Sequence, residues 1–369
     1  MIYLDNGATS FRKPPSVSRA VQQAMATCAN PGRGGYDAAM AAAKTVYSCR
    51  EAASDLFGCL PEQVVFTSNC THGLNIAIRS LVKPGAKVVI SGFEHNAVTR
   101  PLHALGAQLL VAGRKLFDWE DTLEEFEKAL KKHPDAAVFT HVSNVFGYIL
   151  PVEEMARLCR ERGIPFILDA AQSAGVLPVD LTGLGADFIA MPGHKGLLGP
   201  QGTGLLLCRD GGEPLLRGGT GSESLRQEMP DFLPDRLEAG TLNVPGIGGL
   251  GAGLAYLRRV GVDSVYEREH TQLLRCAAGL RRQGMQVFAG AHQAGTVSFL
   301  PGLDPEEAAG KLARMGIALR AGLHCAPLAH ESAGTLESGT VRVSFGWDAN
   351  DRQTDALLRA VSKLPPRKS

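Results

Sequence analysis

Short apolar runs rich in β-branched residues alternate with amphipathic stretches along the chain up to about residue 207. The stretches 122–132 and 153–162 place their apolar residues on one helical face, as amphipathic helices do. Strands that alternate with helices form a mostly parallel sheet with both faces covered. The pattern therefore predicts an α/β fold with a seven-stranded sheet, its strands at residues 64–66, 87–90, 108–111, 137–140, 165–168, 187–190 and 204–207.

The pattern changes after about residue 245, where longer helical stretches precede two separate strand candidates. A chain of 369 residues is long enough for two domains. We therefore expect a large domain, 1–250, and a small C-terminal α+β domain, 251–369. The elements predicted for the smaller part are helices at 246–257, 265–282 and 351–363 and strands at 296–299 and 341–345.

Charge and cysteine content narrow the function classes. With 38 Lys and Arg against 37 Asp and Glu, the chain lacks the excess of positive charge that binding to nucleic acid or to an anionic membrane requires. We therefore expect a small-molecule or protein partner. No secretory signal and no stretch of roughly 18 apolar residues is present, which predicts a cytoplasmic protein. The eight cysteines form no Cys-x-x-Cys pair and no zinc-like spacing, so no metal site is expected.

Polar residues follow the apolar runs at five separate points. In parallel α/β sheets, ligands bind beyond the carboxyl ends of the strands. The sequence therefore predicts a ligand site built from the polar segments 67–71, 93–96, 142–144, Asp169 and 194–195.

Asp169 follows one of these runs directly, and Lys195 comes five residues after the end of another. A lysine amine can form a Schiff base with the aldehyde of pyridoxal 5′-phosphate (PLP), and a carboxylate can pair with its ring nitrogen and keep the ring an electron sink. Taken singly, a surface lysine and a strand-end aspartate are the more common interpretation. The spacing between Asp169 and Lys195, together with the polar residues near them, favours a PLP site.

A phosphate site is indicated at residues 67–75, where Ser, Thr and Asn follow a strand and open a helix. Backbone N–H groups and the Thr71 hydroxyl would face an anion at the positive helix end. An ordinary helix cap is the alternative. The glycine-rich stretches 199–204 and 218–222 lack a dinucleotide-binding or Walker context, so we expect tight turns there.

Three more polar residues are candidates for contact with the cofactor. His95 is either a satisfied loop residue or an imidazole that faces a flat aromatic cofactor. Asn144 and Gln172 are placed to reach the phenolic oxygen of PLP and to tune its electronics.

Together these segments resemble the class V aminotransferase superfamily of PLP enzymes, and more narrowly its cysteine desulfurases and selenocysteine lyases. The resemblance runs from residues 3–9 to 341–344 and implies PLP fold type I. We expect an N-terminal arm, about residues 1–14, able to dock on the small domain. The motifs that carry the resemblance are Asn30-Pro31-Gly32-Arg33-Gly34, Glu94-His95-Asn96-Ala97, Asp169-Ala170-Ala171-Gln172, Gly193-His194-Lys195 and Glu238-Ala239-Gly240-Thr241-Leu242-Asn243.

The resemblance implies roles around the cofactor ring. Lys195 is the Schiff-base lysine, His95 stacks on the ring and Asp169 pairs with its nitrogen. Gln172 and Asn144 lie on the side of the phenolic oxygen.

It also implies a phosphate site and a homodimer. Cys70, through its backbone, joins Thr71 and His194 around the phosphate. Thr241 reaches the phosphate of the neighbouring subunit, so each active site is composite. The chain departs from the family at Pro192, where Ser is frequent, and at 70–72, where Thr-Thr-Glu or Ala-Thr-Glu is usual.

Cys325 lies in Arg320-Ala321-Gly322-Leu323-His324-Cys325-Ala326-Pro327, which matches the segment that carries the nucleophilic cysteine of desulfurases. A thiolate is needed there, and the neighbouring His324 can favour it. A buried structural thiol is the alternative. The following stretch, 326–341, is rich in small residues and suits a loop over the site.

Arg342 matches the family arginine that holds the substrate carboxylate through two hydrogen bonds. Asn144 and Arg33 are further candidates for substrate binding. A surface arginine on a strand is the alternative interpretation of Arg342.

These assignments predict a homodimeric, PLP-dependent cysteine desulfurase. It would convert L-cysteine to L-alanine, leave a persulfide on Cys325 and pass the sulfur to an acceptor protein or scaffold, for iron–sulfur clusters or other thio-cofactors. A selenocysteine lyase acting on L-selenocysteine is a close alternative. An aminotransferase or C–S lyase in which Cys325 is incidental, and a non-catalytic PLP-binding protein, are the others.

Overall fold

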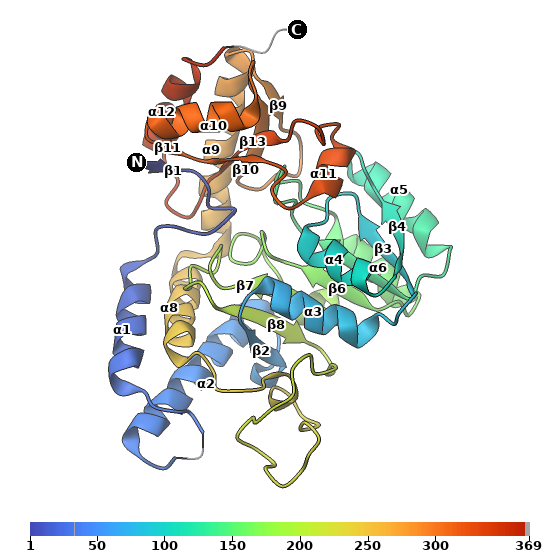
Figure 1. The fold of residues 1–369 in the computed structure, drawn as a ribbon, viewed down its shortest axis with the longest axis vertical. Coiled ribbons are helices and arrows are strands. Elements are labelled where there is room, and N and C mark those ends of the chain that lie inside the picture. Colours follow the sequence, from blue (N-terminus) through green and yellow to red (C-terminus); the bar gives the residue numbers. More distant parts are fainter. Residues whose placement is uncertain (33, 366–369) are drawn as a thin grey trace.

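A seven-stranded sheet forms the centre of the computed structural model, which describes residues 1–32 and 34–365 (Figure 1). The strand order is β2-β8-β7-β6-β5-β3-β4. The pairs from β7 through β4 are parallel, and β8 runs antiparallel to both of its neighbours. All seven predicted strands are confirmed, as β2 Val64–Thr67, β3 Lys87–Ser91, β4 Gln108–Ala112, β5 Ala136–Thr140, β6 Phe166–Asp169, β7 Phe188–Pro192 and β8 Gly204–Cys208.

Alternate residues of the central strands enter two different hydrophobic cores. In β5, Ala137 and Phe139 join one core, while Ala136 and Val138 join the other. Because side chains of a strand alternate between the two faces of a sheet, the sheet needs apolar cover on both sides. The first core includes residues of α2 (Asp37–Phe57), α5 (Trp119–Leu130) and α6 (Val152–Glu161), and the second includes residues of α3 (Cys70–Leu81) and α4 (Asn96–Ala104).

The described part of the chain contains twelve α-helices. Two of them, α8 and α9, follow one another and connect the large sheet to the C-terminal elements (Figure 1). Their bounds are α1 Pro15–Thr27, α2 Asp37–Phe57, α3 Cys70–Leu81, α4 Asn96–Ala104, α5 Trp119–Leu130, α6 Val152–Glu161, α7 Leu181–Leu184, α8 Val244–Val260, α9 Val262–Arg282, α10 Pro305–Arg314, α11 Pro327–Ser332 and α12 Asp351–Val361.

A smaller antiparallel sheet follows, in the order β12-β13-β10-β9. The first strand of the chain, β1 Ile2–Tyr3, pairs in parallel with β11 Ile317–Ala318 beside it. The predicted boundary between residues 250 and 251 falls inside α8, and the division into two domains stays a prediction. The strands of the small sheet are β9 Gln286–Phe288, β10 Thr296–Leu300, β12 Arg320–Gly322 and β13 Thr340–Ser344.

The segment 326–341 differs from the open loop that its composition suggested. It contains α11, which begins at Pro327 and buries Ala329 and His330 completely. Proline is favourable in the first turn of a helix because the backbone N–H that it lacks would have no acceptor within the helix. Among the described residues, no helix combines the length and the apolarity that crossing a bilayer requires.

Glu269 of α9 is buried and has neither a hydrogen bond nor an ion pair with the described residues. Its Oε2 lies so close to Gly295 that a Cβ there would be 2.5 Å away. Burial, assisted by the charge of Asp348, raises the pKa of Glu269 to about 8. The folded protein therefore disfavours the ionised carboxylate. The contribution of protonated Glu269 to the free energy of unfolding is fully present below about pH 4.5 and is lost as the pH rises towards 8.

We expect Glu269→Gln to reduce that loss, because the amide resembles the protonated carboxyl. Urea unfolding at pH 5, 7 and 9 should show the variant gaining about 2–4 kcal/mol over the wild type between pH 5 and pH 9. Glu267→Gln, at an exposed position of the same helix, should follow the wild type. Equal pH dependence in Glu269→Gln and the wild type would contradict the assignment.

Candidate active site

A cavity of ≈ 230 Å³ lies where β5, β6 and β7 end. In the sheet, Thr140 pairs with Asp169, and Asp169 pairs with Ala190, so the ends of these parallel strands meet at one edge. The sequence predicted a ligand site at this edge. The predicted residues that line the cavity are Cys70, Thr71, His95, Asn144, Asp169, Gln172, His194 and Lys195.

Asp169 is the buried last residue of β6. Its Oδ1 accepts hydrogen bonds from the Ala171 amide (2.9 Å) and from the Cys70 thiol (3.4 Å). Its Oδ2 has no donor among the described residues. One carboxylate oxygen is therefore fixed by the protein, while the other remains free for an N–H group within the cavity.

Lys195 lies on the turn that follows β7. Gly193 begins this turn against Thr203, and a Cβ at Gly193 would be 2.1 Å from the Thr203 Oγ1, so only glycine fits. Burial lowers the pKa of Lys195, against the opposing influence of the Asp169 carboxylate. A lowered pKa increases the fraction of neutral amine, which is the nucleophilic form.

His95 is the N-cap of α4, where its Nδ1 accepts a hydrogen bond from the Ala97 amide at 3.0 Å. The ring proton therefore lies on Nε2. Burial lowers the pKa of His95. The imidazole is thus neutral, fixed in orientation and placed on the cavity wall.

The N-terminus of α3 fits the phosphate of a cofactor. Asn69 caps this helix by accepting from the His72 amide at 2.9 Å. The amides of Cys70 and Thr71, in the first turn, have no acceptor among the described residues. Free amides at a helix N-terminus attract an anion.

Residues 7–10 of the N-terminal segment form part of the site, although the sequence gave them no role there. Ala8 lines the cavity, and the carbonyl of Gly7 accepts a hydrogen bond from Gln172 Nε2 at 2.9 Å. The Thr9 hydroxyl lies 3.1 Å from His194 Nδ1. Only the motif resemblance at residues 3–9 could have indicated this contact, because the segment lies far in sequence from the residues that it contacts.

Glu94 is a second residue that the sequence left without a role of its own. It is fully buried, and its Oε1 accepts from the Ser91 hydroxyl at 2.5 Å and from the Thr140 amide at 2.9 Å. Burial raises the pKa of Glu94 to about 8. Glu94 thereby ties the end of β5 to the turn that carries His95.

Arg342 of β13 is almost completely buried. Its Nη2 donates to Asp5 Oδ1 at 2.6 Å and its Nη1 to the Asn144 carbonyl at 2.9 Å, while Nε has no acceptor. Arg342 does not line the cavity itself, but it contacts the backbone of Asn144, which does. The guanidinium retains unused donors beside the site.

Cys325 is the one exposed cysteine in the described part of the chain. It follows β12, and its carbonyl accepts from the Asn96 amide at 2.8 Å, next to His95. The carbonyl of His324 accepts from Asn144 Nδ2 at 2.8 Å. These two bonds hold the Cys325 turn against Asn144 and the start of α4, at the edge of the cavity that His95 and Asn144 line.

The expectation that His324 favours a thiolate on Cys325 is wrong. His324 is buried, and its Nε2 lies 3.2 Å from the Thr340 carbonyl. Burial lowers the pKa of His324 to about 2. The imidazole is neutral at physiological pH and supplies no positive charge, so it fastens the turn to β13 instead.

Thr241 does not line the cavity that contains Lys195. It is exposed and lines a separate hollow of ≈ 640 Å³ together with Tyr47 and Gly219. The segment is held by a buried ion pair in which Arg50 Nη1 contacts Glu238 Oε1 at 2.9 Å. Arg33, predicted to bind substrate, lies outside the described residues.

Three comparisons agree on one family. The family model described as aminotransferase class-V matches residues 2–357. A probable cysteine desulfurase of Pyrococcus abyssi is 33% identical over 384 residues, which cover 99% of this chain and 94% of the relative.

Among solved structures, an apo cysteine desulfurase of Thermococcus onnurineus NA1 is 32% identical with a TM-score of 0.90, and the match covers 98% of this chain and 94% of that one. A cysteine desulfurase of Escherichia coli, in an S-sulfonic acid form, is 25% identical with a TM-score of 0.85 and the same coverage. The chain therefore belongs to the class V aminotransferase family and, within it, to the cysteine desulfurases.

Proposed function

We propose that this protein is a PLP-dependent cysteine desulfurase that takes sulfur from L-cysteine and leaves L-alanine. The observation that carries the proposal is the placement of Lys195, Asp169 and His95 in one cavity, with the exposed Cys325 held at its edge. Class V aminotransferases are PLP-dependent enzymes, and the donors and acceptors of this cavity fit that cofactor.

Four features would hold PLP. Lys195 offers a nucleophilic amine, Asp169 Oδ2 a free acceptor for the ring nitrogen, and His95 a flat neutral ring. The free amides of Cys70 and Thr71 suit the phosphate. When bound, PLP supplies an electron sink that stabilises negative charge developing on the substrate.

Arg342 is the group proposed to bind the carboxylate of L-cysteine. Its Nε has no acceptor, and a guanidinium presents its donors in a planar fork that matches a carboxylate. A substrate bound in this way would present its α-carbon to the cavity that Lys195 lines, and Lys195 is the group proposed to move the α-proton.

Cys325 then takes the sulfur. Its thiolate attacks the substrate sulfur, a sulfur–sulfur bond forms and the bond between Cβ and sulfur breaks. The electron pair of the broken bond remains with the carbon skeleton, which gains a proton and leaves as L-alanine. The products are one persulfide and one alanine, so the step needs no external oxidant or reductant. The exposure of Cys325 gives a protein acceptor access to the persulfide.

We expect Cys325→Ala to abolish persulfide formation and to reduce alanine formation from L-cysteine at least about 100-fold, because the nucleophile is lost. Added L-cysteine should still change the absorbance of the bound cofactor, since substrate binding does not need the thiol. Peptide mass spectrometry would locate the added sulfur, and sulfide and selenide release can be compared in the same preparation.

The matched control for that variant is Cys28→Ala, at a half-buried cysteine that lines no part of the cavity. It should keep wild-type activity. If Cys325→Ala keeps full turnover, the chain acts as an aminotransferase or lyase of the same fold and the thiol is incidental.

We expect Arg342→Lys to raise KM for L-cysteine roughly 10- to 100-fold, because lysine keeps the charge but not the planar fork. Initial rates over a range of L-cysteine concentrations would separate this effect from a change in kcat. Arg359→Lys, at an exposed position on α12, is the control. An unchanged KM in Arg342→Lys would remove Arg342 from the substrate site.

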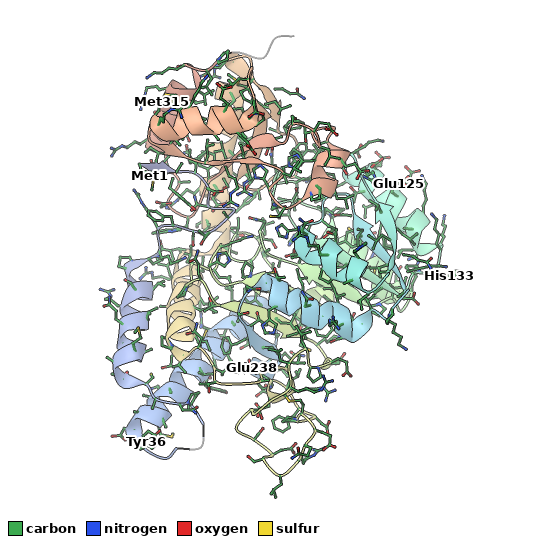
Figure 2. All side chains as sticks on the ribbon, viewed as in Figure 1. Met1, Tyr36, Glu125, His133, Glu238 and Met315 are labelled. Atoms are coloured by element: carbon green, nitrogen blue, oxygen red, sulfur yellow. The ribbon has the colours of Figure 1, made fainter. Side chains whose placement is uncertain are left out.

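A homodimer with composite active sites forms part of the proposal. Tyr36, Met40 and Tyr47 of the α2 region, together with Leu225 and Phe232, are large apolar side chains with high exposure. Tyr47 also lines the hollow that contains Thr241. In Figure 2, Tyr36 lies at the end of the molecule opposite Met315. Large exposed apolar side chains favour association, and a second copy is proposed to bring Thr241 to its partner's phosphate.

We expect light scattering to give twice the mass of one chain. We also expect two inactive variants, each altered in a different part of the composite site, to recover activity when their chains are mixed. In a dimer formed from Lys195→Ala and Thr241→Ala chains, one of the two sites has both residues intact. Random mixing should then restore about a quarter of wild-type activity. A monomeric, fully active enzyme, or no recovery on mixing, would contradict the composite site.

A further inference from the structure

The Cys70 thiol is a buried group to which the reaction above gives no task. It lies at the first position of α3, and its Sγ is 3.4 Å from Asp169 Oδ1. The side chain is 7% exposed and lines the same cavity as Lys195. A small apolar residue would fill this space as well, so the contact with the carboxylate is the feature that a thiol adds.

Cys70 is the donor in this contact. Burial first, and the Asp169 carboxylate next, raise the pKa of the Cys70 thiol well above its ordinary value. The sulfur therefore keeps its proton, and that proton points to the carboxylate. A protonated thiol is also a poor nucleophile, so Cys70 does not compete with Cys325 for the sulfur of the substrate.

The two protein donors to Asp169 share one oxygen. The Ala171 amide and the Cys70 thiol both donate to Oδ1. With two donors on Oδ1, rotation of the carboxylate about its last bond would break both bonds. This arrangement keeps Oδ2 directed at the cavity, as outer hydrogen bonds orient ligating groups in other sites.

We propose that Cys70 is a positioning residue, whose thiol fixes Oδ1 of Asp169 so that Oδ2 is held in place for the ring nitrogen of PLP. The inference rests on the proposed function, because it needs PLP as the cofactor. It adds a role for the Cys70 side chain that is separate from the role of its backbone amide at the phosphate.

The test compares two cofactors in three proteins. Wild type, Cys70→Ala and Cys70→Ser are freed of cofactor and titrated with PLP and with deaza-PLP, in which carbon replaces the ring nitrogen. We expect Cys70→Ala to weaken PLP binding about three- to tenfold. This is the effect of losing one hydrogen bond to a charged group, made smaller because a thiol is a weak donor. Binding of deaza-PLP should not change, because Asp169 has no partner in it.

Cys70→Ser should restore PLP affinity to within about twofold of the wild type, since a hydroxyl can donate to Oδ1. Cys208→Ala removes another buried thiol from the same hydrophobic core and should leave both affinities unchanged. Far-UV circular dichroism would confirm that the variants are folded.

Three results would overturn the inference: equal weakening of PLP and deaza-PLP in Cys70→Ala, no weakening of either, or no recovery in Cys70→Ser. The first would assign Cys70 to packing around the phosphate loop. Failure of the proposed function looks different. A protein that does not use PLP would bind neither PLP nor deaza-PLP as wild type, and a PLP enzyme that is not a desulfurase would show itself by full turnover of Cys325→Ala.

Discussion

The parallel pairing of β5, β6 and β7 is the constraint on which the site depends. It places Thr140, Asp169 and Pro192 at the ends of neighbouring strands, so that each following segment begins at the same edge of the sheet. The backbone bonds of the sheet then fix the distances between side chains that are far apart in sequence. A one-residue slip of β6 would turn Asp169 to the opposite face, and the cavity would lose its carboxylate.

Charged residues of the small sheet and of the N-terminal segment lie beside this edge of the large sheet. Arg320 and Arg342 face each other across β12 and β13, a pairing of like charges that is unfavourable by itself. Asp5 accepts from both, at 3.2 Å and 2.6 Å, and so compensates them. One carboxylate against two guanidinium groups leaves a net positive charge beside the cavity. This balance is suited to a substrate that carries a carboxylate.

Sequence could predict what is local in this protein. Each strand of the large sheet is an apolar run. Asp169 follows such a run directly, and His95 and Lys195 follow within five residues, so periodicity and motif both found them. Contacts such as Arg342 with Asp5, or Gln172 with Gly7, join distant segments and leave no local trace. The burial of His324 was missed for the same reason. Strands of two or three residues, such as β9 and β11, are too short to show a period.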